Sequence, residues 1–156
     1  MARVVVPVPV RWGDLDAYGH VNNVAVLRLL EEARVAAFWH PGVGEPSYPT
    51  AVLHAGPGAQ TTTVVARHEV EYLAPIGHER GGVEVELWIG HLGGASIDVC
   101  YEVHPAGRRE GRPAVRATST LVMLDARTQS PRRIGPEERA AWEPYVEAPV
   151  PHRRRG

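Results

Sequence analysis

Residues 11–39 read RWGDLDAYGHVNNVAVLRLLEEARVAAFW, a polar turn followed by the start of a helix. In the second half of this stretch, apolar side chains recur with the spacing of one helix face, and charged side chains fall opposite them. The apolar set is Val26, Leu29, Leu30, Ala33 and Ala37, and the charged set is Arg28, Glu31, Glu32 and Arg34. Asn22 or Asn23 suits the N-cap, because its side-chain oxygen can accept from the first backbone N–H groups. The pattern predicts a helix over residues 23–39.

The segments on either side of this helix have the patterns of β-strands. Residues 3–11 are rich in Val, but Pro7 and Pro9 cannot donate to a ladder, so we expect this strand at a sheet edge. Alternation and turn residues such as Gly93-Gly94 predict four further strands and a short final helix. These elements cover residues 64–72, 83–89, 96–104, 113–124 and 136–142. On the first of the four strands, one face carries Val64, Ala66, His68, Val70 and Tyr72.

One helix with five antiparallel strands is an α+β layer arrangement. We expect the helix on the concave side of a curved sheet, with acids and Arg on the outer face. Residues 41–60 are rich in Pro and Gly and should form a loop that covers a site. The 156 residues are enough for one domain. We place that domain at 1–148 and expect a disordered tail at 149–156.

Composition and charge exclude several classes of protein. The formal net charge of -1 favours neither nucleic acid nor an anionic membrane, although all 17 basic side chains are Arg. The chain has no run of about 20 apolar residues and no leader-like start, so we expect a soluble cytoplasmic protein. The single cysteine, Cys100, excludes an intramolecular disulfide. Its apolar neighbours predict a buried and unreactive thiol.

Residues 11–23 place two acids, a His and two Asn in the turn before the helix. Asp14, Asp16 and Gly19 match three positions of a calcium-binding EF-hand loop, but Tyr18 and Ala25 stand where ligands are required. A transition-metal site would have only one local nitrogen ligand, from a histidine. We therefore predict no metal site here.

Two interpretations of the turn remain open from the residues alone. Asp and Asn make caps and Asx turns, so the segment is explained as a helix start and nothing more. Alternatively, a carboxylate beside a helix N-terminus lies next to unpaired N–H groups that can receive a substrate carbonyl oxygen. That pairing of a base or nucleophile with an oxyanion site is what acyl transfer needs.

The turn resembles the G-D-x-D-x-x-G-H-V-x-N signature of hotdog-fold acyl-CoA thioesterases, the 4-hydroxybenzoyl-CoA thioesterase and YbgC-like superfamily. Here the signature reads GDLDAYGHVNN over residues 13–23. The resemblance continues in the helix (VLRLLEEAR) and in HEVEYLAPI at 68–76. It then covers GGAS at 93–96 and RATSTLVMLD at 116–125. It implies a hotdog fold, in which a five-stranded antiparallel sheet wraps around a central helix.

The resemblance also implies roles for particular residues. The catalytic carboxylate falls on Asp16, the oxyanion-binding backbone N–H on Asn23, and His20 would position the carbonyl or Asp16. Asp14 would be a structural neighbour. In some relatives a Glu on the helix acts instead, and Glu31 or Glu32 would then be the candidate. Candidate substrate-binding residues are Tyr18, Gly19, Val21, His68 and Ser96, although His68 is also explained as a core or interface histidine and Ser96 as a hairpin residue.

The expected reaction is hydrolysis of an acyl-CoA thioester to a free acid and coenzyme A, with no cofactor apart from the CoA of the substrate. Rival interpretations are an acyl-carrier-protein thioesterase, a hotdog dehydratase or hydratase, and a non-catalytic acyl-CoA-binding module. The resemblance implies a homodimer or homotetramer with sites between subunits. Arg108, Arg109 and Arg112 are candidates for the CoA phosphates, or they form a solvated turn.

Overall fold

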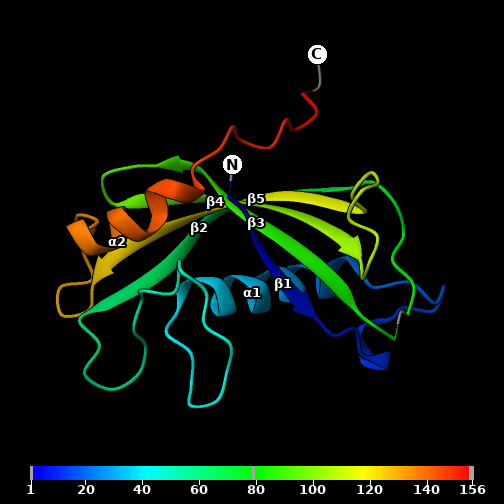
Figure 1. Cartoon of the computed structure of the whole chain (residues 1–156), viewed down its shortest axis with the longest axis horizontal. Helices are drawn as coiled ribbons and strands as arrows, with labels where there is room; N and C mark the ends of the chain where they lie inside the picture. Colours follow the sequence, from blue (N-terminus) through cyan, green and yellow to red (C-terminus); the bar gives the residue numbers. More distant parts are fainter. Residues whose placement is uncertain (1, 79, 155–156) are drawn as a thin grey trace.

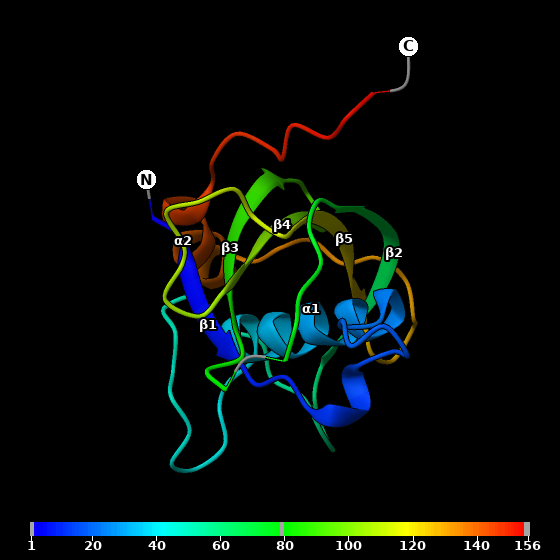
Figure 2. The ribbon, with the colours of Figure 1, turned by 90° about the vertical axis from the view of Figure 1, so that its right-hand side faces the viewer.

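The computed structural model describes residues 2–78 and 80–154. Five antiparallel strands form one sheet in the order β1-β3-β4-β5-β2. The strands are β1 (Val4–Val8), β2 (Thr61–Tyr72), β3 (Val83–Leu92), β4 (Ser96–Pro105) and β5 (Val115–Asp125). The sheet curves around helix α1 (Asn23–Phe38), which lies along its concave side (Figures 1 and 2). This is the α+β arrangement that the sequence predicts.

Short helical elements complete the chain, and they are η1 (Trp12–Asp14), α2 (Pro136–Trp142) and η2 (Glu143–Tyr145). The α2 bounds agree with the predicted final helix. Residues 41–60 contain no regular helix or strand, as their Pro and Gly content predicts. None of the helices in the described part of the chain is long and apolar enough to cross a membrane.

Helix α1 is amphipathic as predicted, with one exception. Asn22 is the N-cap, and its side chain accepts a hydrogen bond from the Val24 N–H at 2.8 Å. The five predicted apolar residues of the inner face are all buried. Arg34, which the sequence assigned to the solvent face, is 4% exposed and donates to the Tyr101 hydroxyl at 3.0 Å. The prediction failed because the partner that makes burial of this guanidinium tolerable comes from β4.

A β-bulge in β2 changes the predicted alternation. Pairing with β5 runs in register except between Val65 and Arg67, where β2 carries one extra residue. Because a bulge shifts the two-residue side-chain period, Val65 rather than Val64 shares the inner face with His68. The sequence prediction placed Val64 on that face and is corrected here.

The two edges of the sheet are β1 and β2. The prediction that β1 is an edge strand, made from its prolines, is confirmed. β2 is the longer edge, with 12 residues. Its apolar side chains Val64, Val65 and Tyr72 are 45%, 40% and 50% exposed. Such an edge presents unpaired backbone groups and apolar surface together.

The segment after η2 contacts the outer face of the sheet at several points as far as Arg153. The Trp88 indole N–H donates to the Ala148 carbonyl at 2.9 Å, and Val150 packs with Trp88 and Cys100. His152 lies 2.9 Å from a Glu71 carboxylate oxygen. Partners on strands far away in the sequence therefore hold this segment.

Cys100 is fully buried, and burial raises the pKa of its thiol, in agreement with the predicted unreactive cysteine.

Candidate active site

The polar turn before α1 is a tight hairpin anchored to the chain after β2. The Asp16 N–H donates to the His20 carbonyl at 2.9 Å, and the Gly19 N–H donates to the Asp16 carbonyl at 3.0 Å. Gly19 has φ = 76°, a conformation that strains residues with a side chain. The Val21 N–H donates to the Ile76 carbonyl at 2.7 Å, which joins the turn to a segment more than 50 positions later. The turn is therefore a fixed part of the fold.

Asp14 is the structural acid of this turn. Its side chain is 1% exposed and accepts from the Arg11 N–H at 2.8 Å. It also forms ion pairs with the side chains of Arg11 and Arg28. Burial alone would raise the pKa of Asp14, but the Arg11 hydrogen bonds and the two positive charges outweigh it and hold that pKa below its ordinary value. Asp14 thus ties the turn to α1.

Asp16 has a different environment two residues later. Its Oδ1 accepts backbone hydrogen bonds from Tyr18 at 2.9 Å and from His20 at 3.4 Å. Within the described residues, Oδ2 forms no hydrogen bond and the carboxylate has no ion-pair partner. One oxygen is therefore held by the backbone, and the other is available to a substrate or a water.

Asp16 lines a cavity of about 520 Å³ together with the first residues of α1. Its lining residues come from the turn, the helix start, the end of β2 and the start of β5. They are Asp16, His20, Val21, Asn22, Asn23, Val26, Tyr72, Leu73, Ala74, Pro75, Ile76 and Val115. The cavity combines one carboxylate, one imidazole and two amides with an apolar wall, a composition typical of a small-molecule site.

The first turn of α1 offers a hydrogen-bond donor at this cavity. The Val24 N–H is taken by the Asn22 side chain, and the Val26 N–H by the Asn22 carbonyl. Asn23 is the first helical residue, so its N–H has no acceptor within the helix. It forms no other hydrogen bond within the described residues. The positive end of the helix dipole adds to its capacity to bind an oxyanion.

The remaining predicted site residues are divided between the cavity and other places. His20 and Val21 line the cavity, whereas the exposed Tyr18 ring and Gly19 do not. Ser96 begins β4, pairs with Val122 and lies outside this cavity. His68 also lies outside it, on the inner face of β2.

His68 belongs to a small polar group between β2, β5 and α1. Its Nδ1 lies 2.7 Å from the Ser119 hydroxyl. Partial burial, and then the nearby charge of Arg34, hold the pKa of His68 below its ordinary value. The helix acids Glu31 and Glu32, the alternative carboxylates, are exposed and also lie outside the cavity lining.

Sequence reasoning missed the wall formed by Tyr72 and the four residues after it. The Tyr72 hydroxyl donates to the Asn23 carbonyl at 2.8 Å, and partial burial raises the pKa of this phenol. The motif HEVEYLAPI contains these residues and was the available signal. The motif alone did not reveal that they lie beside the helix start, because that contact joins positions about 50 residues apart.

The three Arg candidates for CoA phosphates differ in their contacts. Arg109 forms ion pairs with Glu84 at 2.8 Å and Glu86 at 3.4 Å, so its charge is already engaged. Arg112 is exposed and lies three positions before Val115 of the cavity wall. Within the described residues Arg112 forms no ion pair, so of these two its charge is the one left for an anion.

Comparison with solved structures gives several matches over nearly the whole chain. The PA5185 protein of Pseudomonas aeruginosa strain PAO1 is 22% identical with a TM-score of 0.74, and the match covers 94% of this chain and 93% of that one. The PA2801 protein of Pseudomonas aeruginosa is 32% identical with a TM-score of 0.69, and the match covers 89% of this chain and 95% of that one. A thioesterase of Thermus thermophilus, complexed with coenzyme A and Zn, is 28% identical with a TM-score of 0.64, and the match covers 88% of this chain and 94% of that one.

A comparison with curated protein sequences gives no match. The family model of the thioesterase-like superfamily matches residues 10–150, which include every strand of the sheet except β1. The structural matches have the fold implied by the sequence resemblance. The predicted hotdog fold and thioester-hydrolase family are thereby confirmed, and the chain belongs to the thioesterase-like superfamily.

Proposed function

We propose that this protein hydrolyses an acyl-CoA thioester to a free acid and coenzyme A, with Asp16 as the catalytic carboxylate. The observation that carries the proposal is the shared cavity of Asp16 and Asn23 at the start of α1. A carboxylate with one oxygen free of hydrogen bonds lies there beside a helical N–H that has no acceptor within the described residues. Acyl transfer needs both groups at one place.

In the proposed reaction, the thioester carbonyl oxygen accepts a hydrogen bond from the Asn23 N–H. In one route, Asp16 Oδ2 attacks the carbonyl carbon and the C–S bond breaks, so CoA leaves as a thiolate and a mixed anhydride remains; water then hydrolyses the anhydride to the free acid and restores the Asp16 carboxylate. In the other route, Asp16 takes a proton from a water that attacks the carbonyl carbon, the C–S bond of the tetrahedral intermediate breaks, and the departing CoA thiolate receives that proton. In both routes the negative charge that develops on the carbonyl oxygen is stabilised at the helix N-terminus. One such donor contributes about 3 kcal/mol to the barrier reduction.

Backbone hydrogen bonds explain why Asp16 is suited to this reaction. The N–H groups of Tyr18 and His20 hold Oδ1, so the orientation of the carboxylate is set before the substrate arrives. Pre-orientation removes part of the entropy cost of reaching the transition state. We propose that His20, which also lines the cavity, contacts the substrate carbonyl or the attacking water.

The substrate carrier is proposed to be coenzyme A. The Thermus thermophilus relative is complexed with coenzyme A, which supports this choice over an acyl-carrier protein. The lining of the cavity by Val26, Leu73, Ile76 and Val115 provides apolar contact for the acyl group.

We also propose that the protein acts as a homo-oligomer that pairs along β2. This edge is long, and its Val64, Val65 and Tyr72 side chains are exposed. Tyr72 both belongs to that edge and lines the cavity. A second subunit on β2 would therefore lie close to the proposed site.

The test is a thiol-release assay with a panel of aliphatic and aromatic acyl-CoAs, run beside the same acyl groups on acyl-carrier protein. We expect release of free CoA from at least one acyl-CoA, and loss of that release in Asp16→Asn. Acyl-CoA binding by calorimetry without thiol release would instead indicate a binding module. Release only from acyl-carrier protein would contradict the assignment of coenzyme A.

A further inference from the structure

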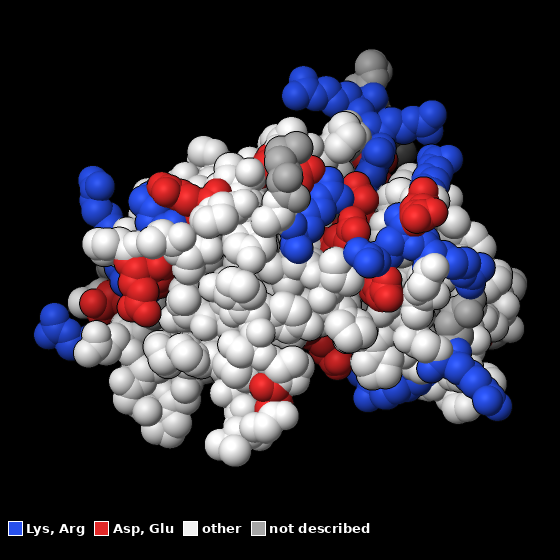
Figure 3. Space-filling view, viewed as in Figure 1, with Lys and Arg blue, Asp and Glu red and all other residues white. Residues whose placement is uncertain are grey.

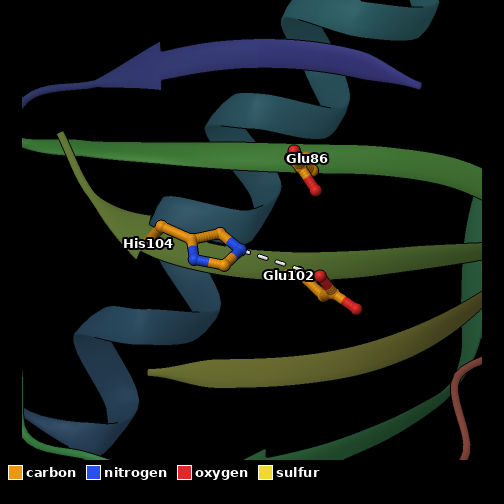
Figure 4. Close-up of side chains that lie close together, drawn as sticks. All are labelled: Glu86, Glu102 and His104. Carbon is orange, nitrogen blue, oxygen red and sulfur yellow. Dashed lines mark ion pairs between the residues drawn. The ribbon is translucent and has the colours of Figure 1, made fainter. Parts of the chain in front are cut away.

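A cluster of three potential metal ligands lies on the outer face of the sheet, on the side away from α1 (Figure 4). Glu86 on β3 and Glu102 on β4 are directly paired across the two strands. His104 follows Glu102 by two residues on β4, so its side chain is on the same face. The pairing of the strands therefore brings together one imidazole and two carboxylates.

His104 is the unusual member of this cluster. It is 1% exposed, and within the described residues neither ring nitrogen has a hydrogen-bond partner. Its Nε2 points toward the Glu102 carboxylate at 3.6 Å, beyond hydrogen-bond length (Figure 4). Buried polar groups are nearly always satisfied, so an imidazole with two unsatisfied nitrogens calls for a partner.

The spacing of the ligand atoms suits a small cation. One ligand atom from each residue lies within 4.8 Å of the others. Two ligands bound to zinc at about 2.0–2.1 Å in tetrahedral geometry are about 3.4 Å apart. The distance of 3.6 Å between His104 Nε2 and Glu102 Oε2 is close to that value. Glu86 supplies the third ligand atom within the same 4.8 Å limit.

A cation already lies at the edge of the cluster. Arg3 Nη1 is 3.1 Å from Glu86 Oε2 and 3.3 Å from Glu102 Oε2. The other nitrogens of Arg3 bond to Glu147 at 2.5 and 3.1 Å, and its guanidinium lies over the Trp88 ring at 3.8 Å. Arg109 Nη1 lies 3.4 Å from the other Glu86 oxygen, Oε1. A metal would therefore compete with one nitrogen of Arg3 at both carboxylates and with Arg109 at Glu86, while the remaining contacts of Arg3 stay in place. Figure 3 shows acidic and Arg side chains intermixed over part of the surface.

We propose that Glu86, Glu102 and His104 form a binding site for a divalent transition metal, with water as a further ligand. Imidazole nitrogen with carboxylate oxygen is a ligand set that zinc accepts in proteins. The site joins β3 to β4 on the face opposite the catalytic cavity. Its metal stabilises the sheet and takes no part in thioester hydrolysis.

The experiment uses the full chain, freed of metal with a chelator and titrated with Zn²⁺ in a calorimeter. We expect one equivalent per chain, and tetrahedral absorption bands when Co²⁺ replaces Zn²⁺. His104→Gln and Glu102→Gln should each weaken Zn²⁺ binding by more than about a hundredfold, because even groups that only orient a ligand are worth about 10- to 100-fold. Arg3→Gln should bind Zn²⁺ more tightly, since it removes the competing cation.

The matched controls are His91→Gln and His54→Gln. His91 is an exposed histidine of the same sheet, and the His54 ring stacks on the His40 ring with 4.3 Å between their centroids. Both should bind Zn²⁺ as the unaltered chain does. Unchanged binding in His104→Gln and Glu102→Gln would overturn the proposal, as would loss of binding in His54→Gln or weaker binding in Arg3→Gln. If His104→Gln does not fold, the Glu102→Gln and Arg3→Gln variants decide. Acyl-CoA hydrolysis should be equal with and without Zn²⁺, so the outcome is independent of the proposed activity.

Discussion

The two acids of the turn before α1 stand two residues apart and have opposite environments. Asp14 is buried, paired with two guanidiniums and hydrogen-bonded to the backbone. Among the residues that the structure describes, only backbone N–H groups bind Asp16, through one oxygen, and Asp16 lines the cavity. The same residue type therefore stabilises the fold at position 14 and remains available for chemistry at position 16. Ion pairing distinguishes them, because two guanidiniums stabilise the charge of the Asp14 carboxylate and make it a weaker base and nucleophile.

The largest effect on turnover is expected from Asp16→Asn, which keeps the shape of the side chain and removes its charge. We expect kcat to fall about a thousandfold, within the about 10²- to 10⁴-fold that a positioned acid–base group contributes. Thermal melting and light scattering should be unchanged. Near-normal kcat in Asp16→Asn, together with an inactive but folded Asp14→Asn, would reverse the assignment of the two acids.

The next effect concerns the donor beside Asp16. Asn23→Pro removes the backbone N–H at the first helical position, where proline is well tolerated, and should lower kcat by about a hundredfold. Asn23→Ala is the matched control, because it keeps the N–H and leaves the Asn22 cap intact. Melting curves of both variants must agree before the rates are compared. Equal kcat in the two folded variants would move the oxyanion site away from Asn23.

A smaller effect is expected from a change on β2, where we propose that a second subunit lies close to the Asp16 cavity. Val65→Glu places a charge on the exposed apolar edge and, in a symmetric pair, sets two like charges close together. We expect the oligomer to dissociate in light scattering and turnover to fall by about tenfold. Val43→Glu, on an exposed valine of the 41–60 loop, should change neither. A monomeric unaltered protein with full activity would contradict the oligomer.

The smallest effect on turnover is expected from Asp14→Asn, whose cost falls on stability. Losing hydrogen bonds and ion pairs to a buried charge should lower the free energy of unfolding by about 2 kcal/mol at pH 7. Turnover at 25 °C should change by less than about threefold if the folded protein keeps its shape.

The stabilisation by Asp14 should also depend on pH. A lowered Asp14 pKa stabilises the folded state above the unfolded pKa of about 3.9, and this contribution is lost as pH falls through the folded value. Urea denaturation should therefore show a difference between the variants that is full above about pH 5 and shrinks below about pH 4. A difference independent of pH would show that the charge of Asp14 is not what stabilises the turn.

Much of the fold follows from local patterns in the sequence. The helix from Asn23, the final helix over 136–142 and the edge position of β1 depend on side-chain periodicity, caps and prolines, which act over a few residues. The turn with Asp16, His20 and Asn23 is equally local, so its motif indicated the candidate site directly. These features are determined by interactions between near neighbours in the chain.

Other features depended on contacts between distant segments. Arg34 is buried because Tyr101 of β4 meets it, and β2 changes phase at a bulge that its pairing with β5 reveals. The tail beyond Pro149 is held through contacts with Trp88 and Glu71.

The candidate sites divide in the same way. The sequence alone identified the chemical groups at the start of α1, because they are adjacent in the chain. Only the tertiary structure placed Tyr72 and residues 73–76 against them, and only strand register brought Glu86, Glu102 and His104 together. The reason is that side-chain periodicity reports which face a residue occupies, whereas the partner across that face is decided by how the strands pair and how the sheet curves around the helix.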